Sequence, residues 1–485
     1  MKNLMKRLLL KEDPNVYQDK DSHLERVLTV KDFLALGVGT IVSTSIFTLP
    51  GVVAASHAGP AVALSFLAAA IVAGLVAFAY AEMSSAMPFA GSAYSWINVV
   101  FGEFFGWIAG WALLAEYFIA VAFVASGLSA NFRGLIEPLG VKLPNYLANA
   151  LGTDGGFVDI TAVVVIVLVA LLLSHGVSEA ARVENILVVL KVLAILVFIF
   201  VGITALHKAN YTPFIPEYHK NADGSAFGGW QGIYAGVSSI FLSYIGFDSI
   251  AANSAEAKNP QKTMPRGILG SLLIAVVLFV AVSLVLVGMF DYSSYANNAE
   301  PVGWALRQSG HPIVATVVQA VAVVGMFTAL IGMMLAGSRL LYSFGRDGML
   351  PKWLGVLNDK KLPNRSLLVL GIVGVVLGAL FPFAFLAQLI SAGTLIAFMF
   401  VSLGIYALRS REGKDIPEPA FKMPFYPVLP AVAFLAALGV FWGLDYDAKL
   451  YSLAWFVLGL IIYFAYGIRH SYLSKRTEGS KNDQQ

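Results

Sequence analysis

Two apolar segments of this sequence, each long enough to cross a membrane, are interrupted by small and polar residues at corresponding places. The first segment, 33–55, is interrupted at 42–45 (VSTS), and the sixth, about 230–255, is interrupted at 244–248 (YIGFD). Backbone N–H and C=O groups without partners are costly in hydrocarbon, so a spanning helix is broken only where protein buries the break or a cavity lies beside it. Breaks at matching places in two halves of a chain are typical of transporters that bind substrate near the middle of the membrane. The alternative is that the small residues only allow close helix packing.

The whole chain has the composition of a membrane protein. Of its 485 residues, 58% are hydrophobic and 13% are charged, and the mean hydropathy is +0.76, which excludes an ordinary soluble domain. Apolar runs of membrane-spanning length recur along the chain. They predict an all-α integral membrane protein with about twelve transmembrane helices, at 33–55, 60–86, 104–131, 158–176, 184–206, 230–255, 268–290, 312–343, 367–382, 384–408, 425–444 and 450–469.

The basic residues predict the orientation of these helices. If both termini are cytoplasmic, the inside connections carry about twice as many Lys and Arg residues as the outside connections. We therefore expect both termini in the cytoplasm. The net charge of +3 then reflects topology, and no nucleic-acid partner is expected.

Several classes of chemistry are excluded or unsupported. The chain has no cysteine, which rules out disulfides and thiol catalysis. None of its seven histidines forms an i, i+4 pair, so we expect no metal site. A GxxxxGK[S/T] phosphate-binding loop is missing from the sequence, so ATP-driven pumping is not expected. We expect neither an enzyme nor a cofactor, so the energy for transport must come from a gradient, or the protein is an exchanger.

The two breaks would present opposite kinds of backbone group. The half-helix beginning at 43–45 would direct free N–H groups and the positive end of its dipole at a carboxylate. Free carbonyl groups near 242–245 would accept hydrogen bonds from an ammonium group. A free L-α-amino acid carries both charges and matches such a site. The predicted substrate-binding residues are Ile41, Val42, Ser43, Thr44, Ser45, Leu242, Ser243 and Ile245.

Ionisable residues inside membrane spans are costly and are functional candidates. Lys191 lies in the otherwise apolar run 186–201 of the fifth span. A lysine in a low-dielectric environment releases its proton more readily, so Lys191 is a candidate for proton coupling. The alternative is that it reaches the cytoplasmic face. Glu116 in the third span would exchange a proton with substrate or with Lys191, or would be a neutral, hydrogen-bonded carboxyl. Asp248 is expected to cap the second half-helix.

Several motifs resemble those of a known transporter family. The stretch GVGTIVSTSIFTLPG at 37–51 resembles the first-helix motif of the amino acid–polyamine–organocation superfamily. Four further stretches resemble motifs of its cationic amino acid transporter branch, bacterial members in particular. These are YAEMSSAMPFAGSAYSW (80–96), GWALLAEY (110–117), SYIGFDSIAANSAEAKNPQKTMPRGI (243–268) and SRLLYSFGRDGMLP (338–351). The resemblance covers roughly 33–470.

The resemblance implies a LeuT-type fold with two inverted repeats of five spans, in which helices 1 and 6 are broken. It also implies a multi-pass protein of a bacterial plasma membrane, monomeric or weakly oligomeric. The segments then divide as follows: cytoplasmic tail 1–32, first repeat 33–206, extracellular loop 207–228, second repeat 229–408, peripheral spans 409–470 and cytoplasmic tail 471–485.

The resemblance also implies roles for individual residues. Lys191 would take the place of the sodium ion that other members of the superfamily use, which makes transport proton-driven. Leu242 occupies a lid position that is often Phe in relatives, and Phe241 is assigned to the same gate. One departure is the Ser-Thr-Ser sequence at 43–45, where bacterial relatives usually have Gly-Thr-Gly.

The side chain of the substrate is expected to be neutral and apolar. Neither break supplies a basic residue, and Met326, Met333 and Met334 would line an adaptable pocket. We expect branched-chain and related hydrophobic amino acids (Leu, Ile, Val, Met). Resemblance to lactic-acid-bacterial branched-chain permeases, with the same Ser-Thr-Ser break, favours the same substrates. The alternatives are a lysine or arginine transporter, an amino acid exchanger and a sensor that binds its ligand without moving it.

Overall fold

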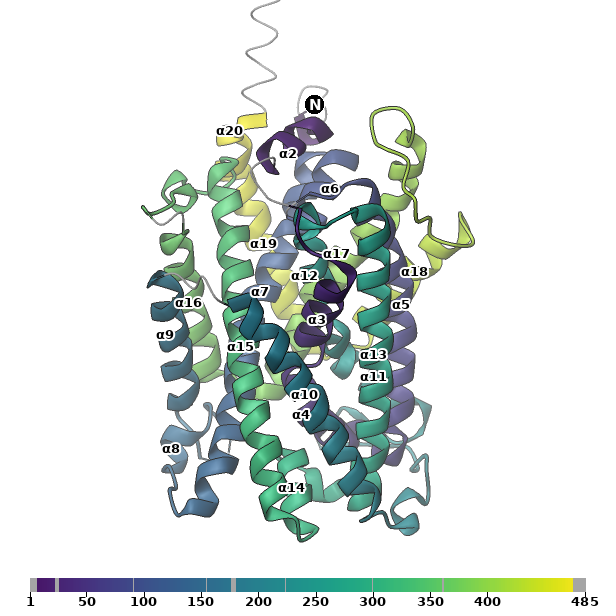
Figure 1. The fold of residues 1–485 in the computed structure, drawn as a ribbon, viewed down its shortest axis with the longest axis vertical. Helices are drawn as coiled ribbons and strands as arrows, with labels where there is room; N and C mark the ends of the chain where they lie inside the picture. The colour runs from purple at the N-terminus through teal and green to yellow at the C-terminus, as the bar shows by residue number, and fades with distance from the viewer. Residues whose placement is uncertain are drawn as a thin grey trace, which may run out of the picture.

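The structure is a computed structural model that is almost entirely helical (Figure 1). It describes residues 7–21, 26–89, 91–153, 155–175, 180–222, 224–298, 300–359 and 362–473. Most of the predicted tail 471–485, and residues 1–6 and 22–25 of the predicted tail 1–32, lie outside these ranges. Within them, one two-stranded antiparallel sheet pairs β1 (His219–Lys220) with β2 (Ala226–Phe227). The predicted all-α class is confirmed.

The helices follow the predicted apolar ranges, with ends that differ by a few residues. The α-helices are α2 (Pro14–Asp21), α3 (Val30–Ile41), α4 (Thr44–Val53), α5 (Val62–Ala86), α6 (Ala93–Val100), α7 (Glu103–Ile136), α8 (Asn145–Ala148), α9 (Ile160–His175), α10 (Ala180–Ile203), α11 (Gly229–Ile240), α12 (Phe247–Ala252), α13 (Pro260–Met289), α14 (Pro301–Gln308), α15 (Pro312–Arg346), α16 (Asn364–Leu380), α17 (Phe383–Arg411), α18 (Val428–Trp442), α19 (Tyr446–Ile462) and α20 (Ile468–His470). Shorter 3-10 and π turns are η1 (Ala54–Ala58), η2 (Gly59–Ala61), η3 (Glu137–Leu139), η4 (Lys208–Tyr211), η5 (Phe241–Tyr244), η6 (Ser254–Glu256), η7 (Tyr292–Tyr295), η8 (Lys352–Gly355) and η9 (Tyr463–Gly467).

Many of these helices are long and apolar enough to cross a membrane. Among the described residues there are 8 such helical stretches, and the first of them, Val30–Ala86, includes two of the predicted spans. Three shorter apolar helices, α9, α16 and α18, accompany them. Apolar helices of this number and length form a bundle in which the backbone polar groups are hydrogen-bonded within each helix.

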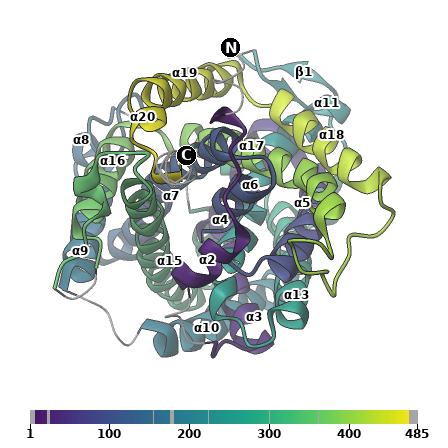
Figure 2. The ribbon, with the colours of Figure 1, turned by 90° about the horizontal axis from the view of Figure 1, so that it is seen from above.

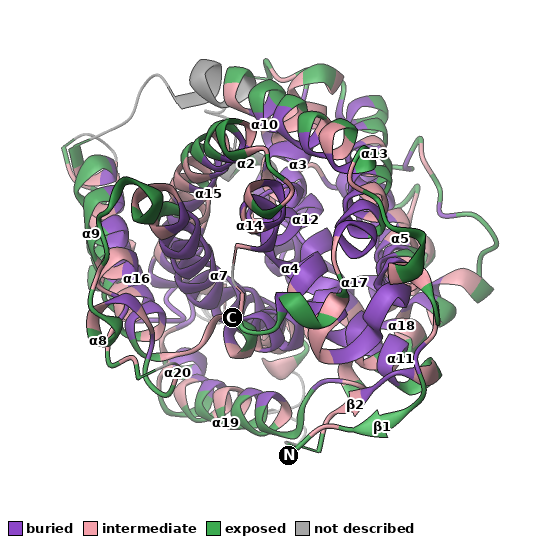
Figure 3. Cartoon of the chain, turned by 90° about the horizontal axis from the view of Figure 1, so that it is seen from below, coloured by how far each residue is buried: buried purple, intermediate pink, exposed green. Residues whose placement is uncertain are grey.

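The two broken segments lie inside the bundle. Seen end-on, α4 is surrounded by longer helices, whereas α18 and α19 lie at the rim (Figure 2). The view from the opposite end shows α12 beside α4 inside the bundle (Figure 3). Helix α13 packs against α5 and α3, and helix α7 packs against α15 and α17. Segments from distant parts of the sequence therefore enclose both breaks.

The outward sides of the rim helices are exposed, as Figure 3 shows by their green outer faces, and many of the exposed side chains are apolar. Leu168 of α9, Leu193 of α10 and Val277 of α13 are each more than half exposed. So much exposed apolar surface is unfavourable in water and favourable against lipid. The pattern is that of a bundle whose rim faces the hydrocarbon of a membrane.

Candidate functional site

The first break separates α3 from α4. Helix α3 ends at Ile41, and α4 begins at Thr44. Between them Val42 (φ −86°, ψ 71°) and Ser43 (φ −117°, ψ −126°) leave the helical conformation. No side chain caps the N-terminus of α4, and Thr44 and Ser45 are buried. The first turn of α4 therefore offers N–H groups inside the protein, as the sequence predicted for this segment.

The second break lies between α11 and α12. Helix α11 continues into the 3-10 turn η5, after which Ile245 is extended and Gly246 has a φ of 139°. A side chain at Gly246 would also meet the first break, because an added Cβ would lie 2.9 Å from Cγ1 of Ile41. Only glycine permits both this backbone and this approach. The two breaks are thus in contact, although they are far apart in the sequence.

Each break holds one buried hydroxyl that has no hydrogen-bond partner in the described part of the structure. These are Oγ1 of Thr44 and Oγ of Ser243. Buried polar groups in folded proteins almost always have a partner, and leaving one unpaired costs about 1–3 kcal/mol. Two such hydroxyls at touching helix breaks indicate a place where a polar ligand supplies the missing partners.

Two backbone groups at the breaks, which the sequence predicted to be free of hydrogen bonds, do form them. The carbonyl of Leu242 accepts a hydrogen bond from the N–H of Ile245 at 3.1 Å, and the N–H of Ser43 donates to the carbonyl of Ile41 at 3.0 Å. Both bonds form because the chain turns tightly at each break instead of remaining extended. The expected free carbonyl at Leu242 and free N–H at Ser43 are therefore wrong for this conformation. Because a carbonyl oxygen has two lone pairs, the Leu242 carbonyl can accept a second hydrogen bond.

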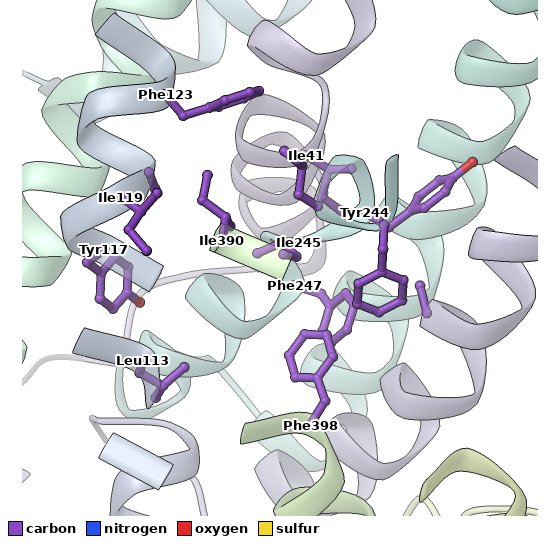
Figure 4. Close-up of a cluster of buried hydrophobic side chains, with 14 of the residues drawn as sticks. Ile41, Leu113, Tyr117, Ile119, Phe123, Tyr244, Ile245, Phe247, Ile390 and Phe398 are labelled. Carbon is purple, nitrogen blue, oxygen red and sulfur yellow. The ribbon is translucent and has the colours of Figure 1, made fainter. Parts of the chain in front are cut away.

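Aliphatic side chains surround the breaks. Ile41 and Ile245 from the two breaks belong to one buried cluster with Ile119 of α7 and Ile390 of α17 (Figure 4). All four are at most 9% exposed. The methionines predicted as pocket residues lie on α15, where Met326 and Met334 are buried and Met333 is partly buried.

Aromatic contacts fix the second break against its neighbours. The hydroxyl of Tyr244 donates to the carbonyl of Phe66 at 3.0 Å, so this side chain points towards α5. Phe247 stacks on Phe398 of α17, with ring centroids 5.1 Å apart. The ring of Phe241 lies edge-on to Phe398 at 6.1 Å. Phe241 and Leu242 are both buried, and their role as a gate stays a prediction.

Lys191 contacts the first broken segment. Its side chain is buried, and Nζ donates to the carbonyl of Gly39 in α3 at 2.8 Å. The side chain thus crosses from α10 to the last turn of α3 instead of reaching a membrane surface. Its contact lies two residues before Ile41.

Glu116 contacts the second broken segment through Asp248. The two buried carboxyl groups are hydrogen-bonded to each other. Thr394 of α17 donates to Oε2 of Glu116 at 2.7 Å, and the N–H of Gly246 donates to Oδ1 of Asp248 at 3.0 Å. Asp248 therefore holds the start of α12, as expected of a capping residue. The sequence did not predict its pairing with Glu116.

No metal centre accompanies these groups in the part of the chain that the structure describes. There, no three His, Asp or Glu side chains are grouped closely enough to hold an ion. The groups at and beside the breaks can form hydrogen bonds and apolar contacts, and Lys191, Glu116 and Asp248 have ionisable side chains.

Comparison with known proteins shows what the chain resembles. The amino acid permease family profile matches residues 28–466. The branched-chain amino acid permease BcaP of Lactococcus lactis subsp. cremoris (strain MG1363) is 67% identical over 459 residues, covering 95% of this chain and 98% of that protein. The methylthioribose transporter of Bacillus subtilis (strain 168) is 36% identical over 460 residues, covering 94% and 97%. The vacuolar cationic amino acid transporter 4 of Arabidopsis thaliana is 33% identical over 420 residues, covering 86% and 69%.

Proposed function

Because the chain belongs to the amino acid permease family, we propose that it takes up branched-chain and related hydrophobic neutral amino acids together with protons. The superfamily resemblance is confirmed, and the relatives make the protein a multi-pass membrane transporter rather than an enzyme. The observation that carries the proposal is the pair of buried, unpartnered hydroxyls of Thr44 and Ser243, one at each break. A free amino acid has polar groups that satisfy both.

The binding geometry follows from the polarity of the breaks. The substrate carboxylate would lie at the uncapped N-terminus of α4, where the N–H groups, the helix dipole and Oγ1 of Thr44 favour an anion. The ammonium group would lie at the second break and donate to Oγ of Ser243 and to the second lone pair of the Leu242 carbonyl. Val42, Ser43, Ser45 and Ile245 complete the proposed contacts.

A neutral, aliphatic side chain fits the surroundings best. The buried cluster that spans both breaks includes isoleucines from each of them, Ile41 and Ile245, which match a branched side chain by apolar contact. The acidic groups nearby, Glu116 and Asp248, bond to each other, which favours a neutral substrate side chain over a cationic one. The name of the relative at 67% identity supports the same substrate class.

The proposed topology has twelve crossings in a LeuT-type arrangement. Spans in 33–206 and 229–408 form two repeats whose first members, α3–α4 and α11–α12, are the broken ones. Two observations support it: the breaks touch, and α18 and α19 from 409–470 lie at the rim (Figure 2). Both termini would lie in the cytoplasm, with 207–228 outside the plasma membrane.

Proton coupling would involve both buried charge sites. A charged ammonium forms a stronger hydrogen bond than a neutral amine, so protonation of Lys191 would strengthen the tie between α10 and Gly39 of α3. Two carboxyl groups that bond to each other need a proton between them, and Glu116 and Asp248 form such a pair beside α12. Each broken segment is thus contacted by one group that can gain or lose a proton.

Uptake of labelled leucine into proteoliposomes tests this function. We expect an inward proton gradient to drive leucine above its equilibrium level, and excess isoleucine, valine or methionine to compete. Methylthioribose, lysine and arginine serve as control competitors. Lysine or arginine uptake without leucine uptake would overturn the substrate assignment. Leucine exchange at a rate independent of the proton gradient would overturn the proton coupling.

A further inference from the structure

The aliphatic part of Lys191 passes directly over a glycine of α15. A Cβ atom added at Gly325 would lie 2.4 Å from Cδ of Lys191, 2.8 Å from Cγ and 3.3 Å from Cε. The first two separations are shorter than any that real Cβ atoms show. Helices α10 and α15 pack against each other here, so Gly325 leaves the space through which the lysine passes.

The atoms that such a Cβ would meet are in the middle of the lysine side chain. The far end, Nζ, is held by the carbonyl of Gly39 at 2.8 Å, and the side chain is only 2% exposed. A methyl group at Gly325 would therefore displace the whole side chain and not only its tip. The bond between Nζ and Gly39 would lengthen or break, because its short range allows little movement.

Another glycine of the same helix lacks this contact. Gly332 lies two helical turns further along α15, and a Cβ added there would meet nothing within 4 Å. Helix propensity alone would make alanine slightly favourable at either position. The two glycines are therefore a matched pair that differ in their relation to Lys191.

We propose that Gly325 is a positioning residue for proton coupling, because its lack of a side chain lets Lys191 reach Gly39 at the end of α3. This inference rests on the coupling role proposed for Lys191. The nearest atoms that a side chain at Gly325 would meet all belong to Lys191, so Gly325 acts through the lysine. The space at Gly325 keeps Nζ of Lys191 within hydrogen-bonding distance of the carbonyl of Gly39 in the first broken segment.

The test compares four variants in proteoliposomes: Gly325→Ala, Gly332→Ala, Lys191→Ala and the double variant Gly325→Ala/Lys191→Ala. For each, the pH dependence of leucine binding is measured alongside leucine accumulation driven by a proton gradient. We expect Gly325→Ala to lower accumulation about tenfold, the size of effect that losing one charge-assisted hydrogen bond produces. It should also flatten the pH profile of binding, whereas Gly332→Ala should match the wild type. In the Lys191→Ala background, Gly325→Ala should add no further loss.

The possible results separate the two claims. If Gly325→Ala keeps the wild-type pH profile, or if its loss is undiminished without Lys191, Gly325 acts through general packing and the inference is overturned. If Lys191→Ala itself keeps normal gradient-driven accumulation, the coupling role of the lysine fails. The pH profile of binding would still show, in that case, whether Gly325 positions the lysine.

Discussion

The two buried ionisable sites, Lys191 and the pair of Glu116 and Asp248, differ in the partners that they bond to. Lys191 bonds to a backbone carbonyl at the end of α3, whereas Glu116 bonds to a second carboxyl group at the start of α12. The first contact ties a continuous helix to a broken one through one donor. The second ties two helices through a network that includes Thr394 and Gly246. Loss of a proton would therefore loosen α3 by weakening one bond, but would place a net charge within the network beside α12.

Removing the lysine should give the largest effect. Lys191→Ala deletes the hydrogen bond to the carbonyl of Gly39, so we expect gradient-driven accumulation of leucine to be lost while leucine binding remains measurable. Uptake with and without a proton gradient checks this, and Lys142→Ala, at an exposed residue, is the control. Normal accumulation in Lys191→Ala would remove the lysine from the coupling mechanism.

Changes at the carboxyl pair should act on stability as well as transport. Glu116→Ala removes one hydrogen-bond partner of the buried Asp248 carboxyl, which keeps the N–H of Gly246, and the loss of such a partner typically costs about 1–3 kcal/mol. Glu116→Gln keeps a hydrogen-bonding group in place, so we expect a smaller loss of stability but impaired coupling. Thermal unfolding of the detergent-solubilised protein measures the first effect. Unfolding temperatures of both variants that equal that of the wild type would show that the carboxyl pair does not stabilise the fold.

The hydroxyls at the breaks should affect binding without affecting stability. Ser243→Ala removes an oxygen that has no partner in the described structure, so the substrate-free protein loses no hydrogen bond. We expect leucine affinity to fall by roughly three- to tenfold, as for the loss of one hydrogen bond. Ser283→Ala is the control. The buried hydroxyl of Ser283 donates to the carbonyl of Phe279, so its removal should lower stability without changing leucine affinity. Unchanged leucine affinity in Ser243→Ala would place the ammonium site elsewhere.

A third charge site lies at the start of α14, a helix at the end of the molecule opposite the N-terminus (Figure 1), and should respond to pH more weakly. Burial raises the pKa of Glu300 from 4.5 to about 7, against the opposing effect of Arg307. The folded protein then binds more protons than the unfolded chain between these values, so this stabilisation is complete below about pH 4.5 and is lost as the pH rises through 7.

The variant Glu300→Gln isolates that contribution. Between pH 5 and pH 8 the unfolding temperature of the wild type should fall relative to that of Glu300→Gln. Parallel curves for the two proteins would mean that Glu300 does not titrate in this range. Glu137, the other acidic group that acts on Glu300, is the residue to replace in a control.

The sequence predicted features that depend on local composition. Both breaks were found because serine, threonine and glycine interrupt apolar runs, and Lys191 was found because it is charged within one such run. The structure places the two breaks in contact, which the sequence expected only through the matching positions of the two segments.

The partners of these residues were not predicted. The pairing of Glu116 with Asp248, the contact of Lys191 with Gly39 and the space at Gly325 all depend on how helices from distant parts of the chain rotate and cross. One sequence shows the period of a helix but not the neighbour that each face meets. The hydrogen bond at the Leu242 carbonyl was missed because a break in an apolar run does not reveal how tightly the chain turns there.

Measuring the movement of protons with the substrate is the most direct test of proton-coupled leucine transport. Proteoliposomes would be loaded with a pH-sensitive dye, and leucine would be added outside with no initial pH gradient and the membrane potential clamped. We expect leucine to acidify the interior for the wild type and Lys191→Ala to abolish this signal. Uptake of leucine by the wild type with no change of internal pH would contradict proton coupling.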